Sequence, residues 1–89
     1  MRTEVSWFAG EMEKRLKAND NKGGWQSCSI WWLYKRLLEE TGELAEVLSG
    51  ARDGNSTKEA ADVANFAMMI ADQVEKGAEG LSPEGRQMR

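Results

Sequence analysis

The sequence contains no histidine. Without this residue the chain cannot build Ser-His or Cys-His nucleophilic pairs, a His-ligated zinc site, or the Glu-x-x-His pattern of di-iron carboxylate proteins. A di-iron oxidase is therefore disfavoured. The remaining catalytic chemistry relies on oxygen ligands, since carboxylates hold hard cations such as Mg²⁺ or Mn²⁺.

Cysteine, basic charge and long apolar runs are also scarce. Cys28 is the single cysteine, so an intrachain disulfide is excluded, and one free thiol suits a reducing compartment. Twelve basic residues against fifteen acidic ones give a net charge of −3, which argues against a nucleic-acid-binding module. We find no signal-peptide pattern and no apolar run long enough to span a bilayer. We therefore expect a soluble, cytoplasmic protein with no membrane or nucleic-acid partner.

The size and the pattern of the chain predict an all-α fold. With 89 residues and 40% hydrophobic content, the protein has one domain at most and a core of modest stability, which oligomerisation can support. A first amphipathic helix is expected over residues 3–18, with Thr3 as its N-cap. A second begins near Ser27 or Ser29 and ends at about Leu48, before a Ser-Gly pair.

The third helix and the tail complete the predicted chain. Ser56-Thr-Lys-Glu59 matches a capping box, in which Ser56 accepts a backbone hydrogen bond. The helix then runs to about Lys76, and Gly77 follows as its stop. Residues 78–89 contain one proline and two glycines without a period, so we expect a flexible tail. We expect the second and third of these three helices to form an antiparallel hairpin, in which motifs on both of them can face each other.

Two acidic pairs are the most informative feature of the sequence. Glu40 with Glu43, and Glu59 with Asp62, each have i,i+3 spacing. On a helical wheel Glu40 and Glu59 overlap the apolar arcs, Glu43 and Asp62 lie at the margins, and Glu39 stands apart. One such pair usually faces water, but carboxylates on an apolar face need a partner such as a metal ion. Four carboxylates from a hairpin can converge on one volume.

Such a cluster repels itself unless cations or protons neutralise it. Mg²⁺ resolves this conflict and, when it binds triphosphate oxygens, helps a water molecule to attack phosphorus. The carboxylate least engaged with the metal can accept the proton of that water. Glu39 is our candidate for this base.

The motif also resembles a known family. The segment Arg36-Leu-Leu-Glu-Glu-Thr-Gly-Glu-Leu44, followed by Glu59-Ala-Ala-Asp-Val-Ala-Asn65, is similar to the EExxE…ExxD signature of MazG-like, all-α nucleoside triphosphate pyrophosphohydrolases. The resemblance covers roughly residues 22–75. One departure is Arg36, which replaces the family's usual lysine and keeps the charge with a different geometry.

The resemblance implies a fold and an activity. The fold would be a MazG-like helical domain over residues 1–77, whose subunits pair as a homodimer or homotetramer and complete a four-helix-bundle-like core. The activity would be hydrolysis of a nucleoside triphosphate, often a deoxynucleotide, to the monophosphate and pyrophosphate, with attack at the α-phosphorus. Such enzymes clear unwanted nucleotides. The implied Mg²⁺ ligands, for which Mn²⁺ is a possible substitute, are Glu40, Glu43, Glu59 and Asp62.

Other residues carry weaker predictions with open alternatives. Lys22 and Arg36 can contact phosphate, although lone basic residues are more often solvated. Trp25 follows a Lys-Gly-Gly turn and can stack on a base, or pack in the core or at a subunit interface. Asn65 can orient a ligand or sugar, or serve as a surface or helix-contact amide. The alternative function is a catalytically silent helical module, whose acidic groove binds cations or a basic partner, or which serves only assembly.

Overall fold

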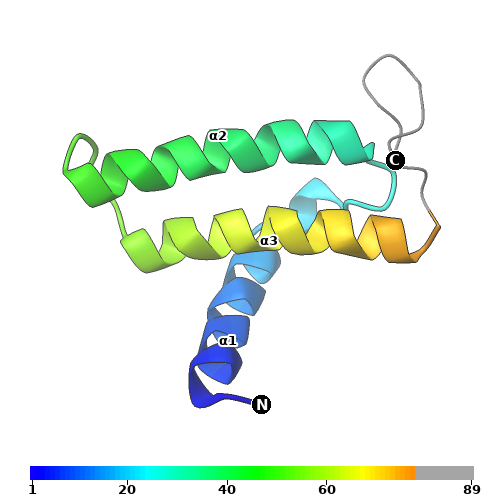
Figure 1. The fold of residues 1–89 in the computed structure, drawn as a ribbon, viewed down its shortest axis with the longest axis horizontal. Coiled ribbons are helices and arrows are strands. Elements are labelled where there is room, and N and C mark those ends of the chain that lie inside the picture. The colour runs from blue at the N-terminus through cyan, green and yellow to red at the C-terminus, as the bar shows by residue number, and fades with distance from the viewer. Residues whose placement is uncertain (78–89) are drawn as a thin grey trace.

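The computed structural model describes residues 1–77, and the predicted flexible tail over 78–89 lies outside this range. Within this range, helices are joined by turns and loops and there is no strand, which confirms the predicted all-α class. In chain order, the helical elements are α1 (Thr3–Ala18), the short 3₁₀ helix η1 (Asp20–Lys22), α2 (Ile30–Ser49) and α3 (Ser56–Glu75). Figure 1 shows the arrangement of α1, α2 and α3. Among these, no helix combines the length and apolar character needed to cross a membrane.

The helices α2 and α3 form an antiparallel hairpin, as predicted, and lie side by side in Figure 1. Gly50 ends α2 with φ +82°, a left-handed conformation that favours glycine, and its N–H donates to the carbonyl of Val47. Gly77 follows α3 in the same way, with φ +88°. The hairpin therefore brings the start of α3 beside the end of α2, where the two acidic pairs occur.

The helix starts agree with the sequence at α2 but not at α3. Ser29 caps α2, because its Oγ accepts from the backbone N–H of Trp32 at 3.0 Å. The predicted capping box at Ser56 is wrong by one residue. Asn55 is the N-cap, with extended φ and ψ, and its Oδ1 accepts from the N–H of Lys58 at 3.1 Å. Asparagine is as strong an N-cap as serine, and Asn55 directly precedes Ser56 in the chain.

The first helix packs on α3 and makes no close backbone contact with α2. Thr3 is its first helical residue, so the prediction of Thr3 as N-cap is also wrong. The cap position belongs to Arg2, which makes no capping hydrogen bond with its side chain. No residue of α1 is fully buried. One tie to α3 is the buried amide of Asn65, whose Nδ2 donates to the carbonyl of Met12 at 3.0 Å.

The hydrophobic core is small. Among residues 1–77, only Leu33 and Ala61 are fully buried apolar residues. Helix α3 lies between α1 and α2, so both of its sides are covered, and two of its buried residues, Asn65 and Gln73, are polar. In contrast, Val74, near the end of α3, is 53% exposed. Buried polar side chains, rather than a large apolar centre, therefore form much of the interior within residues 1–77.

Candidate functional site

A cavity of about 580 Å³ opens between the three helices and the loop after η1. Because α2 and α3 are antiparallel, each end of the cavity lies between the start of one helix and the end of the other. The residues that line these two ends differ in chemistry. Where α2 ends and α3 begins, the wall is charged, with Glu43, Lys58 and Glu59. Where α2 begins and α3 ends, the wall is aromatic and apolar and consists of Trp25, Trp32, Leu33, Phe66 and Met69. A cavity of this volume is within the usual range for small-molecule sites.

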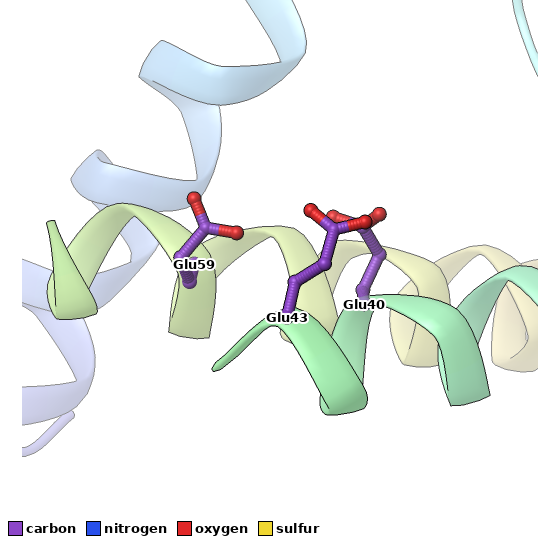
Figure 2. A group of neighbouring side chains, drawn as sticks. All are labelled: Glu40, Glu43 and Glu59. Atoms are coloured by element: carbon purple, nitrogen blue, oxygen red, sulfur yellow. The ribbon is translucent and has the colours of Figure 1, made fainter. Parts of the chain in front are cut away.

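Three carboxylates meet at the charged end. Glu40 and Glu43 project from α2, and Glu59 projects from α3 (Figure 2). One oxygen of each carboxylate lies within 4.8 Å of the others. The i,i+3 spacing places the α2 pair one turn apart, and the hairpin supplies the third group. Three carboxylates without nitrogen or sulfur ligands are a donor set that suits hard cations such as Mg²⁺ or Mn²⁺.

Glu40 is the most buried of the three, with 7% of its surface exposed. Burial raises the pKa of its carboxyl group, and the neighbouring charge of Glu43 raises it further. Arg36 acts in the opposite direction, with its Nη2 at 3.2 Å from Glu40 Oε2. Arg36 therefore does not cancel the effect of burial and of Glu43 on the pKa of Glu40. A divalent cation would do so.

Asp62, the fourth predicted ligand, lines the same cavity but is not part of this group. Both of its oxygens accept from Arg15 of α1, with Nε at 2.9 Å and Nη2 at 3.3 Å. The structure therefore brings together three of the four predicted metal ligands, whereas the fourth, Asp62, forms an ion pair with Arg15. Sequence reasoning did not identify Arg15, because helical spacing in residues 3–18 does not indicate which distant helix it will meet.

Glu39, the proposed base, lies on the outer side of α2. Its side chain is 45% exposed and forms an ion pair with Arg36, and it does not line the cavity. The guanidinium of Arg36 also forms an ion pair with Glu40, so it contacts both Glu39 and Glu40. It lies 5.2 Å from the ring centroid of Phe66. Arg36 itself lines the cavity. Its two ion pairs compete with the predicted phosphate contact.

No protein-family model, curated protein or solved structure matches the chain. The likeness to MazG-like enzymes therefore depends on the motif residues alone. Three of those residues, Glu40, Glu43 and Glu59, are also the three that converge in space. A functional assignment depends on this geometry and on the chemistry of the cavity around it.

The residues with weaker predictions all line the cavity: Lys22, Trp25, Arg36 and Asn65. Lys22 is exposed at the end of η1. The indole Nε1 of Trp25 donates to Asp72 Oδ2 at 2.9 Å. Asn65 serves as a helix-contact amide through its bond to Met12, which was one of its two predicted roles.

Proposed function

We propose that the protein is a Mg²⁺-dependent nucleoside triphosphate pyrophosphohydrolase of the MazG-like type. It would convert a (deoxy)nucleoside triphosphate to the monophosphate and pyrophosphate and so remove unwanted nucleotides. The observation that carries the proposal is the two-ended cavity, with three convergent carboxylates at one end and aromatic surface at the other. A nucleotide has two corresponding ends, a charged phosphate chain and a flat base.

Glu40, Glu43 and Glu59 are the residues that would hold the cation. Bound Mg²⁺ supplies charge neutralisation and polarises phosphate oxygens. Asp62 would join the ligand set only after leaving Arg15, because both of its oxygens accept hydrogen bonds from that guanidinium. Without Asp62, the three glutamates would still provide a site.

Glu39 is the residue to which we assign the general-base role. Glu39 and Asp62 are the two motif carboxylates outside the three-carboxylate group, and Asp62 is held by two hydrogen bonds from Arg15. Because Glu39 does not line the cavity, the role requires its side chain to turn towards the cavity. Its contact with Arg36 is exposed, and exposed ion pairs contribute little to stability, so Arg36 can exchange it for a phosphate oxygen at small cost. Arg36 would thereby bind the triphosphate as Glu39 becomes available to water.

The other binding roles follow the two ends of the cavity. Lys22, at the rim, would contact phosphate, and Trp25 would stack on the base. Base-aromatic stacking contributes about 1–3 kcal/mol per base and depends little on base identity. Asn65 would orient the sugar only if its amide left Met12, so we give this role to it last.

A second copy of this chain is the partner we propose, in a homodimer or homotetramer with a four-helix-bundle-like core. Two fully buried apolar residues are few for a stable isolated domain. Helix α2 carries a second apolar seam on its outer side, whose members are three, four, seven and three residues apart, close to the spacing of helix-helix interfaces. Leu38 is 55% exposed in this seam and Leu48 is 67% exposed. The members of the seam are Trp31, Tyr34, Leu38, Ala45 and Leu48.

The second candidate function is a catalytically silent helical module with an acidic groove. The observation that favours it is the presence of built-in counterions, since Arg15 and Arg36 already pair with Asp62 and Glu40. If these pairs suffice, the carboxylates need no metal ion. The two candidates differ in turnover and in metal binding.

The experiment that separates them is a panel of canonical and modified nucleoside triphosphates with Mg²⁺ and separate detection of pyrophosphate and phosphate. We expect pyrophosphate, not phosphate, from at least one deoxynucleotide, and none after Glu40→Gln. Glu13→Gln is the control, because Glu13 is an exposed carboxylate outside the cavity. If no triphosphate in the panel releases pyrophosphate, the silent module replaces the enzyme.

A further inference from the structure

One buried side chain fixes the loop that forms the aromatic end of the cavity. Gln73, on the last turns of α3, has 7% of its surface exposed. Its Nε2 lies within hydrogen-bond distance of three loop carbonyl oxygens, those of Trp25 at 3.1 Å, Gln26 at 2.9 Å and Cys28 at 3.1 Å. An amide NH₂ has two hydrogens, so at least one is shared between two carbonyls.

The loop has few other restraints. Between η1 and α2, its backbone makes one internal hydrogen bond, from the N–H of Cys28 to the carbonyl of Trp25 at 3.0 Å. Gln73 thus provides three of the four hydrogen bonds between this loop and α3 within residues 1–77, and the fourth is the bond from the Trp25 indole to Asp72. A buried amide without these acceptors would be costly, so the loop and α3 depend on each other.

Asp72, one residue before Gln73, fixes the side chain of Trp25 on the same loop. Its Oδ2 accepts from Trp25 Nε1 at 2.9 Å and from Lys76 Nζ at 3.0 Å. An indole has a single N–H, so this bond determines how the ring is oriented. The backbone of Trp25 is held by Gln73 and its ring edge by Asp72, while the residue lines the cavity.

We propose that Gln73 and Asp72 are positioning residues, which hold Trp25 as a rigid stacking surface for the planar base of the nucleotide. The inference rests on the proposed function, because the base is the planar group that a nucleotide brings. Binding to a ring that is already fixed loses less conformational entropy than binding to a mobile one. Neither residue touches the ligand, and both act through Trp25.

The test is binding rather than turnover, so that it can fail separately from the proposed hydrolysis. The probe is a deoxynucleoside triphosphate with an imido group between the α- and β-phosphorus, which resists cleavage there, titrated calorimetrically with Mg²⁺. We expect Trp25→Ala to weaken binding about 5-fold to 150-fold, the range for loss of one stacking contact. Gln73→Met removes the donors at similar length and should weaken binding to a similar extent.

The double variant decides whether Gln73 acts through Trp25. If it does, Gln73→Met combined with Trp25→Ala binds within about twofold of the weaker single variant. Inorganic tripolyphosphate, which has no base, should bind all of these variants equally. Gln73→Lys restores N–H donors towards the carbonyls and should recover part of the affinity. Glu75→Gln, an exposed change on the same helix, is the control.

Asp72→Ala keeps the test decisive if Gln73→Met does not fold, because Asp72 is not in the core. It should weaken nucleotide binding and leave tripolyphosphate binding unchanged. The inference is overturned if Trp25→Ala and Gln73→Met multiply in their effects, or if tripolyphosphate binding falls in parallel. Nucleotide binding that follows these expectations without any hydrolysis would overturn the proposed enzyme and leave the positioning role intact.

Discussion

Glu40→Gln should make the metal-free protein more stable, although the change removes an ion pair. Glu40 is buried and lies beside two other carboxylates. Glutamine has the same shape without the charge, so it removes both the desolvation of the carboxylate and its repulsion from Glu43 and Glu59. A purely structural ion pair between Arg36 and Glu40 predicts the opposite result.

The magnitude follows from the distances. Two unit charges 4.8 Å apart repel by about 3–4 kcal/mol at an effective dielectric constant of 20 and by less than about 1 kcal/mol in bulk water. The side chain of Glu43 is 32% exposed, which places its repulsion between these limits. Loss of the contact with Arg36, at 3.2 Å, offsets most of the gain. A net stabilisation of about 1 kcal/mol would raise Tm by about 4–8 °C for a domain of this size.

Mg²⁺ should reverse the order of the two proteins. At 100 times its dissociation constant, a ligand that binds only the native state stabilises it by about 2.7 kcal/mol. The wild type should gain this stabilisation, whereas Glu40→Gln should lose most of it. Glu13→Gln, an exposed change outside the cavity, should behave as the wild type in both conditions.

The pH dependence has a defined sign. The pKa of Glu40 is raised in the folded protein, chiefly by burial. Protonation of the Glu40 carboxyl group therefore stabilises the metal-free fold, and this stabilisation is complete at pH values below the ordinary glutamate pKa. It is lost as the pH rises through the raised pKa of Glu40 in the folded protein. The excess stability of Glu40→Gln should thus shrink towards acidic pH.

Thermal unfolding at one fixed protein concentration measures all of these quantities, with EDTA or with Mg²⁺. The concentration is held constant because oligomerisation also changes Tm. A metal-free Glu40→Gln protein that melts below the wild type, or a Mg²⁺ shift equal to that of the wild type, would refute the reasoning.

Three further predictions concern the site and its assembly. Glu39→Gln should lower kcat about 10²-fold to 10⁴-fold, the usual loss for a general base, with Mn²⁺ affinity by electron paramagnetic resonance unchanged; a loss of Mn²⁺ binding would make Glu39 a ligand. Arg15→Gln should lower Tm by several degrees, since charged hydrogen bonds contribute about 1.5–3 kcal/mol, and it should tighten Mn²⁺ binding by freeing Asp62. Unchanged Mn²⁺ affinity would keep Asp62 outside the ligand set. Leu38→Glu should reduce the oligomer to monomers in analytical ultracentrifugation, whereas Lys35→Glu, exposed on the same helix, should not; persistence of the oligomer would exclude the α2 seam.

Local information in the sequence was sufficient for the helices. Periodicity and turn residues predicted the bounds of three helices and their hairpin, because these depend on near neighbours. The helical wheel also ranked Glu40 as more buried than Glu39, as the structure has it. The start of α3 was missed by one residue, since Asn55 and Ser56 are both good caps and only the backbone conformation selects between them.

Contacts between distant segments could not be predicted in this way. Arg15 meets Asp62 across 47 positions, because α1 crosses α3 rather than α2. A wheel identifies one face of a helix but not the element that covers it. Gln73 is similar, since a glutamine near a helix end reads as surface until the loop carbonyls that accept from it are known.

The most direct measurement of the central proposal is ³¹P nuclear magnetic resonance of a reaction run in ¹⁸O-labelled water. With Mg²⁺ and a deoxynucleoside triphosphate from the panel, we predict two products, pyrophosphate and a monophosphate that carries the ¹⁸O, as attack at the α-phosphorus requires. EDTA or Glu40→Gln should abolish both signals. Inorganic phosphate as the product, ¹⁸O in pyrophosphate, or no hydrolysis of any triphosphate would contradict the proposal.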